Sequence, residues 1–187
     1  MNPNKIFDTP PLTENLRYGP NYKPIAPPVR LDWRAEGGFI AAVEKCNGVG
    51  ACRKVNAGAM CPSYMATREE KHTTRGRANA LRAAMSGGLS TNNFTSEDLI
   101  DVLDLCLECK GCKSECPSSV DMAKLKVEIL HQYQEQNGVS LRTNFLANIN
   151  KLLKIGSKLP IFINFLNRNI VSKYLLHIFV GIHKDTN

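Results

Sequence analysis

Four cysteines stand close together in the second half of the chain with the spacing C-x2-C-x2-C-x3-C, and a proline follows at once. They are Cys106, Cys109, Cys112 and Cys116, followed by Pro117. Thiolates at this spacing bind the irons of a cubane iron–sulfur cluster, and the fourth cysteine of such a run characteristically binds a second cluster elsewhere in the fold. The sequence therefore predicts an electron carrier and requires a second group of cysteines.

A second and less regular group precedes this run. It contains Cys46, Cys52 and Cys61, and Pro62 again follows the last cysteine. Because the last cysteine of each group is expected to bind the other group's cluster, the two groups predict two mixed sites. The predicted ligand sets are Cys106, Cys109, Cys112 and Cys61 for a 4Fe–4S cluster, and Cys46, Cys52 and Cys116 for a second cluster.

The second site lacks one thiolate. Val49 stands between Cys46 and Cys52, where a regular motif would place its middle cysteine. A cube without one ligand can lose that iron and persist as a 3Fe–4S cluster, or it can take a ligand other than cysteine. His72 is the nearest candidate in the sequence for such a ligand. We therefore expect one 4Fe–4S cluster and a second cluster that is either 3Fe–4S or 4Fe–4S.

Zinc is the main alternative for cysteines at these spacings. Structural zinc normally takes its four ligands from two separated pairs, and a tight triplet followed by C-P suits that tetrahedral geometry poorly. The spacing therefore favours iron–sulfur clusters, which thiolates also suit. The odd number of cysteines, seven, and a polar N-terminus without a signal peptide argue against a disulfide framework. Reduced, metal-bound thiols indicate a cytoplasmic location.

The composition sets broad limits on the partners. Of the 187 residues 43% are hydrophobic, as in a globular protein, and the net charge is +7. That charge fits an acidic partner, an anionic membrane surface or a solvated basic face. No stretch reaches the roughly 18 consecutive apolar residues of a spanning helix, which leaves open contact with the inner face of a membrane. The basic stretch 68–77 has no interleaved aromatic residues, which argues against a nucleic-acid partner.

The elements that position the cysteines are expected to be helices. Apolar residues recur at helical spacing, Thr74 and Thr95 are candidate N-caps, and no segment alternates convincingly as a strand does. We predict an all-α chain. Its expected parts are an extended, proline-rich linker or surface wrap (1–36), a cysteine-bearing helical domain (37–138) and an amphipathic basic helical tail (139–187). The tail is expected to lie on a membrane, on a partner protein or over this chain's own core.

Several strings around the cysteines resemble one family closely. They read C-x-G-x-G-x-C-R-K (46–54), G-x-M-C-P-S-Y-x-A-T-R-E-E (58–70), T-R-G-R-A (74–78) and D-L-C-L-x-C-K-G-C-K-x-E-C-P (104–117). These strings are similar to the iron–sulfur segment of FAD-linked oxidases of the D-2-hydroxy-acid dehydrogenase type, which act on D-lactate, D-2-hydroxyglutarate or glycolate. The resemblance covers residues 37 to 135.

The resemblance implies an α-helical ferredoxin fold, shared with the iron–sulfur subunits of succinate dehydrogenase and fumarate reductase. In those subunits a C-x5-C arrangement without a middle cysteine accompanies a 3Fe–4S cluster, which supports the ligand count by analogy. The resemblance also implies that FAD belongs to an oxidase domain or subunit outside this chain, and that a downstream cysteine-rich domain or another acceptor takes the electrons. Residues 1–6, M-N-P-N-K-I, look like the last turn of that FAD domain.

The sequence thus predicts an iron–sulfur electron-transfer module without a catalytic site of its own. It would relay electrons from the flavin of a D-2-hydroxy-acid dehydrogenase to an acceptor, as a fragment or a separate subunit of the larger oxidoreductase. Two other interpretations remain open. One is a non-redox structural module that binds metal and docks other proteins, and the other is the iron–sulfur subunit of a membrane complex that reduces quinone.

Overall fold

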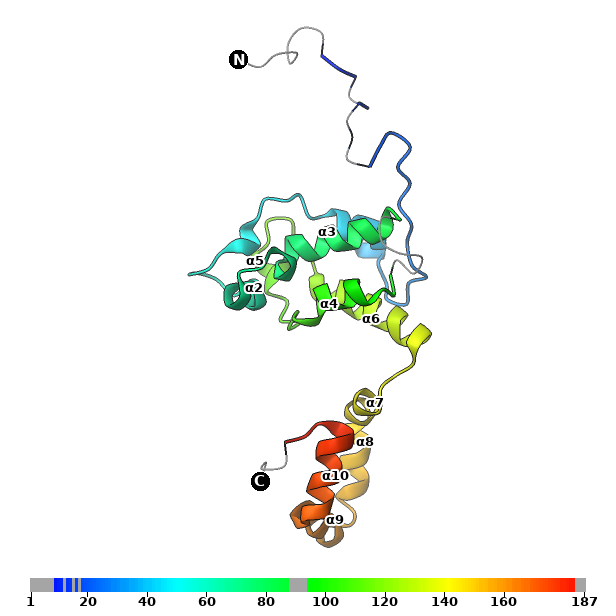
Figure 1. Cartoon of the computed structure of the whole chain (residues 1–187), viewed down its shortest axis with the longest axis vertical. Helices are drawn as coiled ribbons and strands as arrows, with labels where there is room; N and C mark the ends of the chain where they lie inside the picture. Colours follow the sequence, from blue (N-terminus) through cyan, green and yellow to red (C-terminus); the bar gives the residue numbers. More distant parts are fainter. Residues whose placement is uncertain (1–8, 12, 15, 17, 88–93, 184–187) are drawn as a thin grey trace. The chain divides into compact units, whose positions relative to one another are not determined.

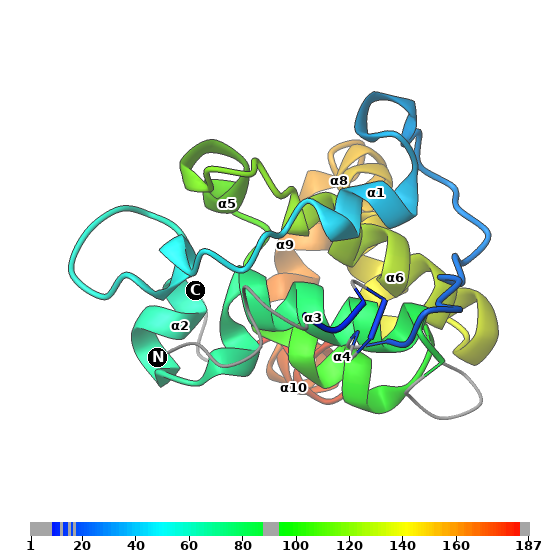
Figure 2. The same cartoon turned by 90° about the horizontal axis from the view of Figure 1, so that it is seen from above.

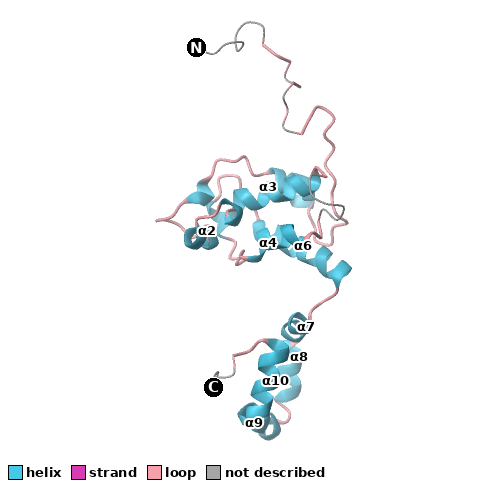
Figure 3. Cartoon of the chain, in the orientation of Figure 1, coloured by secondary structure: helices cyan, strands magenta, loops and turns pink. Residues whose placement is uncertain are grey.

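The computed structural model describes residues 9–11, 13, 14, 16, 18–87 and 94–183 (Figure 1). Within these residues the chain forms helices and loops and no strand, which confirms the all-α prediction (Figure 3). The helices of the first part are η1 Arg34–Glu36, α1 Phe39–Glu44, η2 Ala51–Arg53, α2 Pro62–Thr67, η3 Glu70–His72, α3 Thr74–Met85, α4 Glu97–Asp104, α5 Gly111–Glu115 and α6 Met122–Asn137. The remaining helices are α7 Leu141–Ala147, α8 Ile149–Gly156, α9 Pro160–Arg168 and α10 Ile170–Val180.

The chain divides into two compact units, Met1–Gln136 and Asn137–Asn187. All seven cysteines belong to the first unit. The first unit therefore holds the candidate chemistry.

Helix α3 lies at the centre of the first unit and packs against α1 and α4. The core side chains of α3, α4 and α6 are almost completely buried and include Leu81, Met85, Leu99, Leu103 and Ile129. Full burial of one such side chain contributes roughly 1.5–3 kcal/mol of hydrophobic stabilisation. This apolar layer holds together the helices from which the cysteine loops depart.

The N-caps of α3 and α4 each lie one residue away from the predicted ones. The hydroxyl of Thr73 accepts a hydrogen bond from the Gly76 N–H at 2.8 Å, so α3 begins at Thr74. The hydroxyl of Ser96 accepts from the Leu99 N–H at 3.4 Å, so α4 begins at Glu97. Adjacent hydroxyl residues are equivalent in the sequence, and only the backbone geometry selects the cap.

The end of the proline-rich segment is held on helix α6 by one carboxylate. Glu128 is completely buried and accepts hydrogen bonds from the backbone N–H groups of Arg30 and Leu31 at 2.8 and 2.9 Å, and from the indole N–H of Trp33 at 2.9 Å. Gln132, one turn further along α6, donates to the Pro28 carbonyl at 2.6 Å. The segment therefore ends as a wrap that packs against the first unit.

Candidate metal centres

The cysteines leave the helices at loops with tightly constrained backbones. Cys61 has a left-handed backbone, with φ 57°, and directly precedes Pro62 at the start of α2. Glu108 and Lys110 also have positive φ, 54° and 59°, in the loop between α4 and α5. Non-glycine residues rarely adopt this conformation. Viewed from above, the segment between α1 and α2 forms a wide loop beside α2 (Figure 2).

A first cavity collects four cysteines from both groups. Its lining includes Cys61, Cys106, Cys109 and Cys112, together with Thr74, Arg77 and Met122. Cys61 and Cys112 are buried, Cys106 is half-buried and Cys109 is exposed. The lining thus brings together the four thiols that the sequence assigns to the 4Fe–4S cluster.

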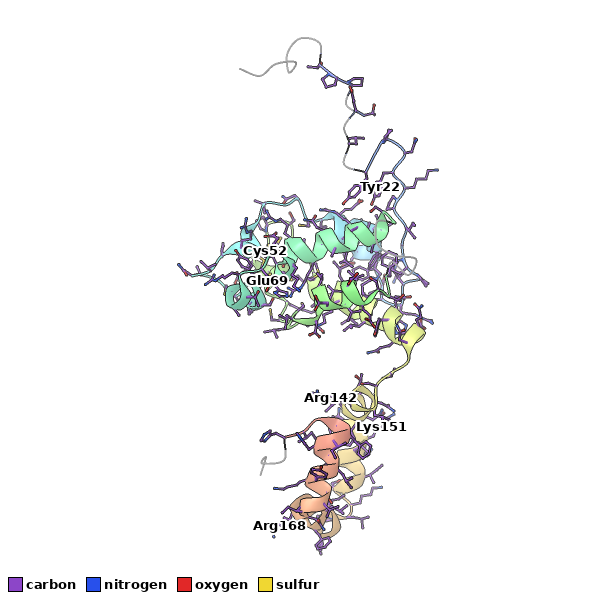
Figure 4. The ribbon with its side chains drawn as sticks, in the orientation of Figure 1. Tyr22, Cys52, Glu69, Arg142, Lys151 and Arg168 are labelled. Atoms are coloured by element: carbon purple, nitrogen blue, oxygen red, sulfur yellow. The ribbon has the colours of Figure 1, made fainter. Side chains whose placement is uncertain are left out.

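A second cavity collects the other three cysteines. Cys46, Cys52 and Cys116 line it together with Asn47, Val49, Gly50, Ala51, Thr74 and Arg75. Figure 4 labels Cys52 on the first unit. Val49 is 61% exposed, at the edge of this cavity. Each cavity therefore takes one cysteine from the other group, as the sequence predicts, and the role of these thiols as ligands remains a prediction.

The donor set of each cavity fits a cluster of soft metal ions. Four thiols line the first cavity and three line the second, and thiolates are the ligands that iron–sulfur clusters prefer. In the described part of the chain, no three side chains of His, Cys, Asp or Glu come close enough to share a single ion. A cluster, by contrast, distributes its thiolates over several irons, so its ligands surround a space.

Glu115 joins the two cysteine loops. Its carboxylate accepts hydrogen bonds from the backbone N–H groups of Ala59 and Met60 at 2.6 and 3.3 Å. Glu115 directly precedes Cys116, and Met60 directly precedes Cys61. One carboxylate therefore fixes the two exchanged cysteines relative to each other.

A cation holds the backbone of the leading cysteine at each cavity. At the first cavity the ammonium of Lys126, on α6, donates to the carbonyls of Asp104 and Cys106 at 3.0 and 2.8 Å. At the second cavity the guanidinium of Arg82, on α3, donates to the carbonyls of Glu44 and Cys46 at 3.1 and 2.5 Å. In both places a cation satisfies carbonyls at the end of a helix, where intrahelical partners are missing.

Helix α6 also holds α5 through a buried carboxylate. The Oδ1 of Asp121 accepts from the Lys124 N–H at 3.1 Å at the start of α6, and its Oδ2 forms an ion pair with Lys113 at 3.0 Å. Burial opposes ionisation of Asp121, but these contacts prevail and its pKa lies below the ordinary value. Lys113 directly follows Cys112, so the ion pair positions the first cavity's helix.

The thiols of Cys52 and Cys61 influence each other. The hydrogen bond with Cys61 lowers the pKa of Cys52 to about 6, and the same hydrogen bond together with burial raises the pKa of Cys61. Cys61 also accepts from the Thr74 backbone N–H at 3.1 Å, and its sulfur lies 3.0 Å from the Thr74 hydroxyl. Burial raises the pKa of the Cys112 thiol. Thr74 lines both cavities, so the two cavities share this residue.

Each cavity is also lined by one arginine. Arg77, at the first cavity, is 2% exposed and donates to the His72 and Val102 carbonyls at 2.7 and 3.1 Å and to the Ser63 hydroxyl at 3.0 Å. Arg75, at the second cavity, donates to the Glu70 carboxylate at 2.7 Å and remains partly exposed. The hydrogen bond to Glu70 raises the pKa of Arg75. A guanidinium is always protonated in proteins, so a positive charge lines each cavity.

The structure does not bring His72 to the second cavity. His72 is 4% exposed and its Nδ1 lies 2.7 Å from the Thr67 hydroxyl, and it is absent from the residues lining that cavity. Its nearness in the sequence was misleading because η3 turns the ring toward α2. Sequence reasoning also missed Arg82 and Lys126. Their only signal was a charged residue on an otherwise apolar helix face.

Comparisons with known proteins show what the chain is similar to. Residues 42–120 match the family described as a 4Fe-4S dicluster domain. The chain is 29% identical over 151 residues to the D-2-hydroxyglutarate dehydrogenase of Pseudomonas putida, covering 64% of the chain and 15% of that protein. It is 24% identical over 215 positions to the Escherichia coli protein of the same name, covering 92% of the chain and 20% of that protein.

A relative with a different name is similar over a shorter range. The chain is 33% identical over 81 residues to a probable glycolate oxidase iron-sulfur subunit of Bacillus subtilis, covering 41% of the chain and 17% of that protein. The chain thus spans a fifth or less of the length of these curated relatives. No solved structure is significantly similar to it.

Proposed function

We propose that the chain is an iron–sulfur segment of the D-2-hydroxy-acid dehydrogenase type of oxidase and that it relays single electrons from a reduced flavin to an acceptor. When bound, the clusters supply the redox chemistry, and the protein supplies ligands, burial and hydrogen bonds. The flavin belongs to a partner domain or subunit in this proposal. The support is that the chain covers only 15% and 20% of the two relatives named as dehydrogenases.

One observation carries the proposal: each cavity is lined by cysteines from both sequence groups. In the proposed arrangement Cys61, Cys106, Cys109 and Cys112 hold a 4Fe–4S cluster in the first cavity. Cys46, Cys52 and Cys116 hold a 3Fe–4S cluster in the second cavity. The exchange of ligands ties the two loops together and places the clusters on either side of Thr74.

The surrounding side chains favour electron transfer between fixed sites. Lys126 and Arg82 hold the backbones of Cys106 and Cys46, which limits movement of the ligands when the charge of a cluster changes. Arg77 and Arg75 place a positive charge beside each site, which stabilises the added electron. The chain thus orients and tunes the two centres.

Metal analysis under anaerobic conditions tests the proposal. The purified chain is expected to be brown and to hold about seven irons, four in the cube and three in the second cluster. The oxidised protein should give an electron paramagnetic resonance signal, because an oxidised 3Fe–4S cluster is paramagnetic and an oxidised cube is not. A colourless protein with stoichiometric zinc would refute an electron-transfer role.

Reduction by a flavin tests the direction of transfer. Photoreduced flavin, added without oxygen, is expected to bleach the cluster absorbance, and a one-electron acceptor should then restore it. Clusters that assemble but do not exchange electrons with either reagent would support a structural role for the metal instead.

A further inference from the structure

The two units differ sharply in charge. Residues 1–136 carry 17 basic and 16 acidic residues, whereas residues 137–187 carry seven basic residues and one acidic residue, Asp185. Asp185 lies outside the described residues. The basic residues of the second unit are Arg142, Lys151, Lys154, Lys158, Arg168, Lys173 and Lys184. Nearly all of the chain's net charge therefore belongs to the C-terminal unit.

The same unit exposes an unusual amount of apolar surface. Ile161, Ile170 and Leu141 are 88%, 82% and 71% exposed. Phe165 and Phe179 are also more than half exposed. Single exposed apolar residues are ordinary, but large contiguous apolar surfaces mark sites of interaction. Here such exposed apolar side chains recur on α7, α9 and α10 within about forty residues.

The helices of the unit also enclose an apolar groove of about 830 Å³. Its lining is mostly aliphatic and includes Leu152 and Leu153 of α8, Ile163 of α9, and Leu175 and Leu176 of α10. None of the described helices combines the length and apolar character needed to cross a bilayer. A partner that covers these apolar surfaces therefore contacts several short helices.

Lysines among the apolar residues favour a lipid surface over a protein partner. On α8, exposed Lys151 and Lys154 flank the exposed side chains of Leu152, Leu153 and Ile155. Protein interfaces are depleted in lysine. An anionic bilayer attracts lysine without a fixed partner, and the flexible stem lets the ammonium reach the headgroups while the neighbouring side chains enter the apolar layer.

We propose that the unit formed by α7–α10 binds the surface of an anionic lipid bilayer. Lys151, Lys154 and Lys158 lie over the headgroups, and Ile161 and Phe165 enter the boundary of the acyl chains. Figure 4 labels three cations of this unit, Arg142, Lys151 and Arg168. Such a contact would hold the electron-transfer unit next to acceptors in the membrane. It goes beyond the proposed electron relay and does not depend on it.

Vesicle flotation with the full, cluster-bearing chain tests the proposal. The chain is expected to float with vesicles that contain phosphatidylglycerol and not with vesicles of phosphatidylcholine alone, and 0.5 M salt should weaken the binding. Each basic residue near an anionic surface contributes on the order of a fivefold change in partition. The variant K151Q/K154Q should therefore bind roughly 25-fold more weakly.

Matched variants separate the contributions of charge and of apolar burial to vesicle binding. K23Q/K54Q removes two exposed lysines of the first unit and should bind as the native chain does. I161Q/F165Q should reduce partition by about tenfold or more, because it removes apolar burial and leaves every charge in place. Cluster absorbance, measured in each variant, reports whether the first unit remains intact.

Two outcomes would overturn the proposal. Equal binding of the native chain and K151Q/K154Q would exclude the charge contribution. If the chain does not float with anionic vesicles and instead dimerises or binds a partner protein through this unit, the surface is a protein interface. Neither outcome changes the reduction and reoxidation of the clusters. Failure of the membrane proposal is therefore distinguishable from failure of the proposed electron relay.

Discussion

The two cavities are built from the same parts but differ in completeness. The first has four cysteines, a buried arginine, and lysines that hold or directly follow its cysteines. The second has three cysteines, a partly exposed arginine and Val49 at its edge. Sites with the same chemical plan thus differ in the burial of their arginine and in the number of their cysteines. We expect this difference to give the sites different clusters and potentials.

The exchanged cysteines should produce the largest effect. We expect Cys116→Ser to empty the second site and to disturb the first, because Cys116 continues the loop that carries Cys112, and Glu115 beside it holds Ala59 and Met60. Cys109→Ser should affect the first site alone, since Cys109 is exposed and lines only that cavity. Iron content and the paramagnetic signal, measured in each variant, report the occupancy of the two sites. A paramagnetic signal of the oxidised 3Fe–4S cluster that persists in Cys116→Ser would contradict the exchange.

Replacing Val49 by cysteine should remove the difference between the sites. Val49→Cys places a thiol at the edge of the second cavity, where a fourth ligand is missing. We expect iron to rise from about seven to about eight per chain and the paramagnetic signal of the oxidised protein to disappear. Ala51→Cys, in the same cavity lining, is the matched control and should leave both unchanged. A persisting signal in Val49→Cys would show that the loop cannot deliver this ligand.

The two arginines should tune the potentials unequally. Removing a positive charge disfavours the reduced cluster, and a buried charge acts more strongly than a solvated one. We expect Arg77→Gln to lower the first potential by on the order of tens of millivolts, and Arg75→Gln to lower the second by less. Redox titration measures both shifts. Arg77→Lys should largely restore the potential, because it retains the charge, and no restoration would assign the effect to lost hydrogen bonds.

Cysteine spacing predicts two ligand sets, and the thiols of each set line one cavity. The rule of exchanged ligands depends on chain connectivity, and Cys61 and Cys116 lie in the cavities that this rule predicts. The all-α fold could also be predicted, because the apolar residues between Cys61 and Cys116 recur at helical spacing.

Contacts between distant residues could not be predicted in this way. The Glu115 carboxylate reaches backbone groups more than fifty positions away, and Glu128 reaches Trp33 across ninety-five. Sequence nearness suggested His72 as a ligand, but the path of η3 turns its ring to Thr67. Periodicity reports which face of a helix is buried. It does not report which carbonyl a buried cation will meet.

The link between the two loops predicts a smaller effect, on stability. Gly58 and Gly48 both have positive φ, 80° and 78°, so alanine strains the backbone at either position. At Gly58 the added Cβ would also overlap the Glu115 carboxylate, whereas at Gly48 it meets nothing. Displacing Glu115 leaves two N–H groups without their acceptor. We expect Gly58→Ala to unfold more easily than Gly48→Ala by about 1–3 kcal/mol. Equal chemical denaturation midpoints for Gly58→Ala and Gly48→Ala would show that Glu115 can move without loss of stability.

The ion pair that holds α5 predicts the smallest effect. Asp121 is almost buried beside Lys113, whereas Asp101 forms a pair of similar length, 2.9 Å, with Lys71 at the surface. We expect Asp121→Asn to lower the free energy of unfolding by about 1 kcal/mol at pH 7, as measured by chemical denaturation. Asp101→Asn should not lower it measurably, because exposed ion pairs contribute little.

The pH dependence of the stability lost in Asp121→Asn tests whether the carboxylate charge causes that loss. The pKa of the Asp121 carboxyl lies below its ordinary value because its contacts with Lys124 and Lys113 outweigh the opposing effect of burial. A lowered pKa means that the stabilisation is complete above the unfolded pKa, roughly 3.9, and is lost as the pH falls through the folded value. The difference between the native chain and Asp121→Asn should therefore shrink below about pH 4 in metal-free protein. A loss of stability in Asp121→Asn that is constant with pH would assign the loss to packing. The position of α5 at the first site would then depend on the shape of the Asp121 side chain more than on its charge.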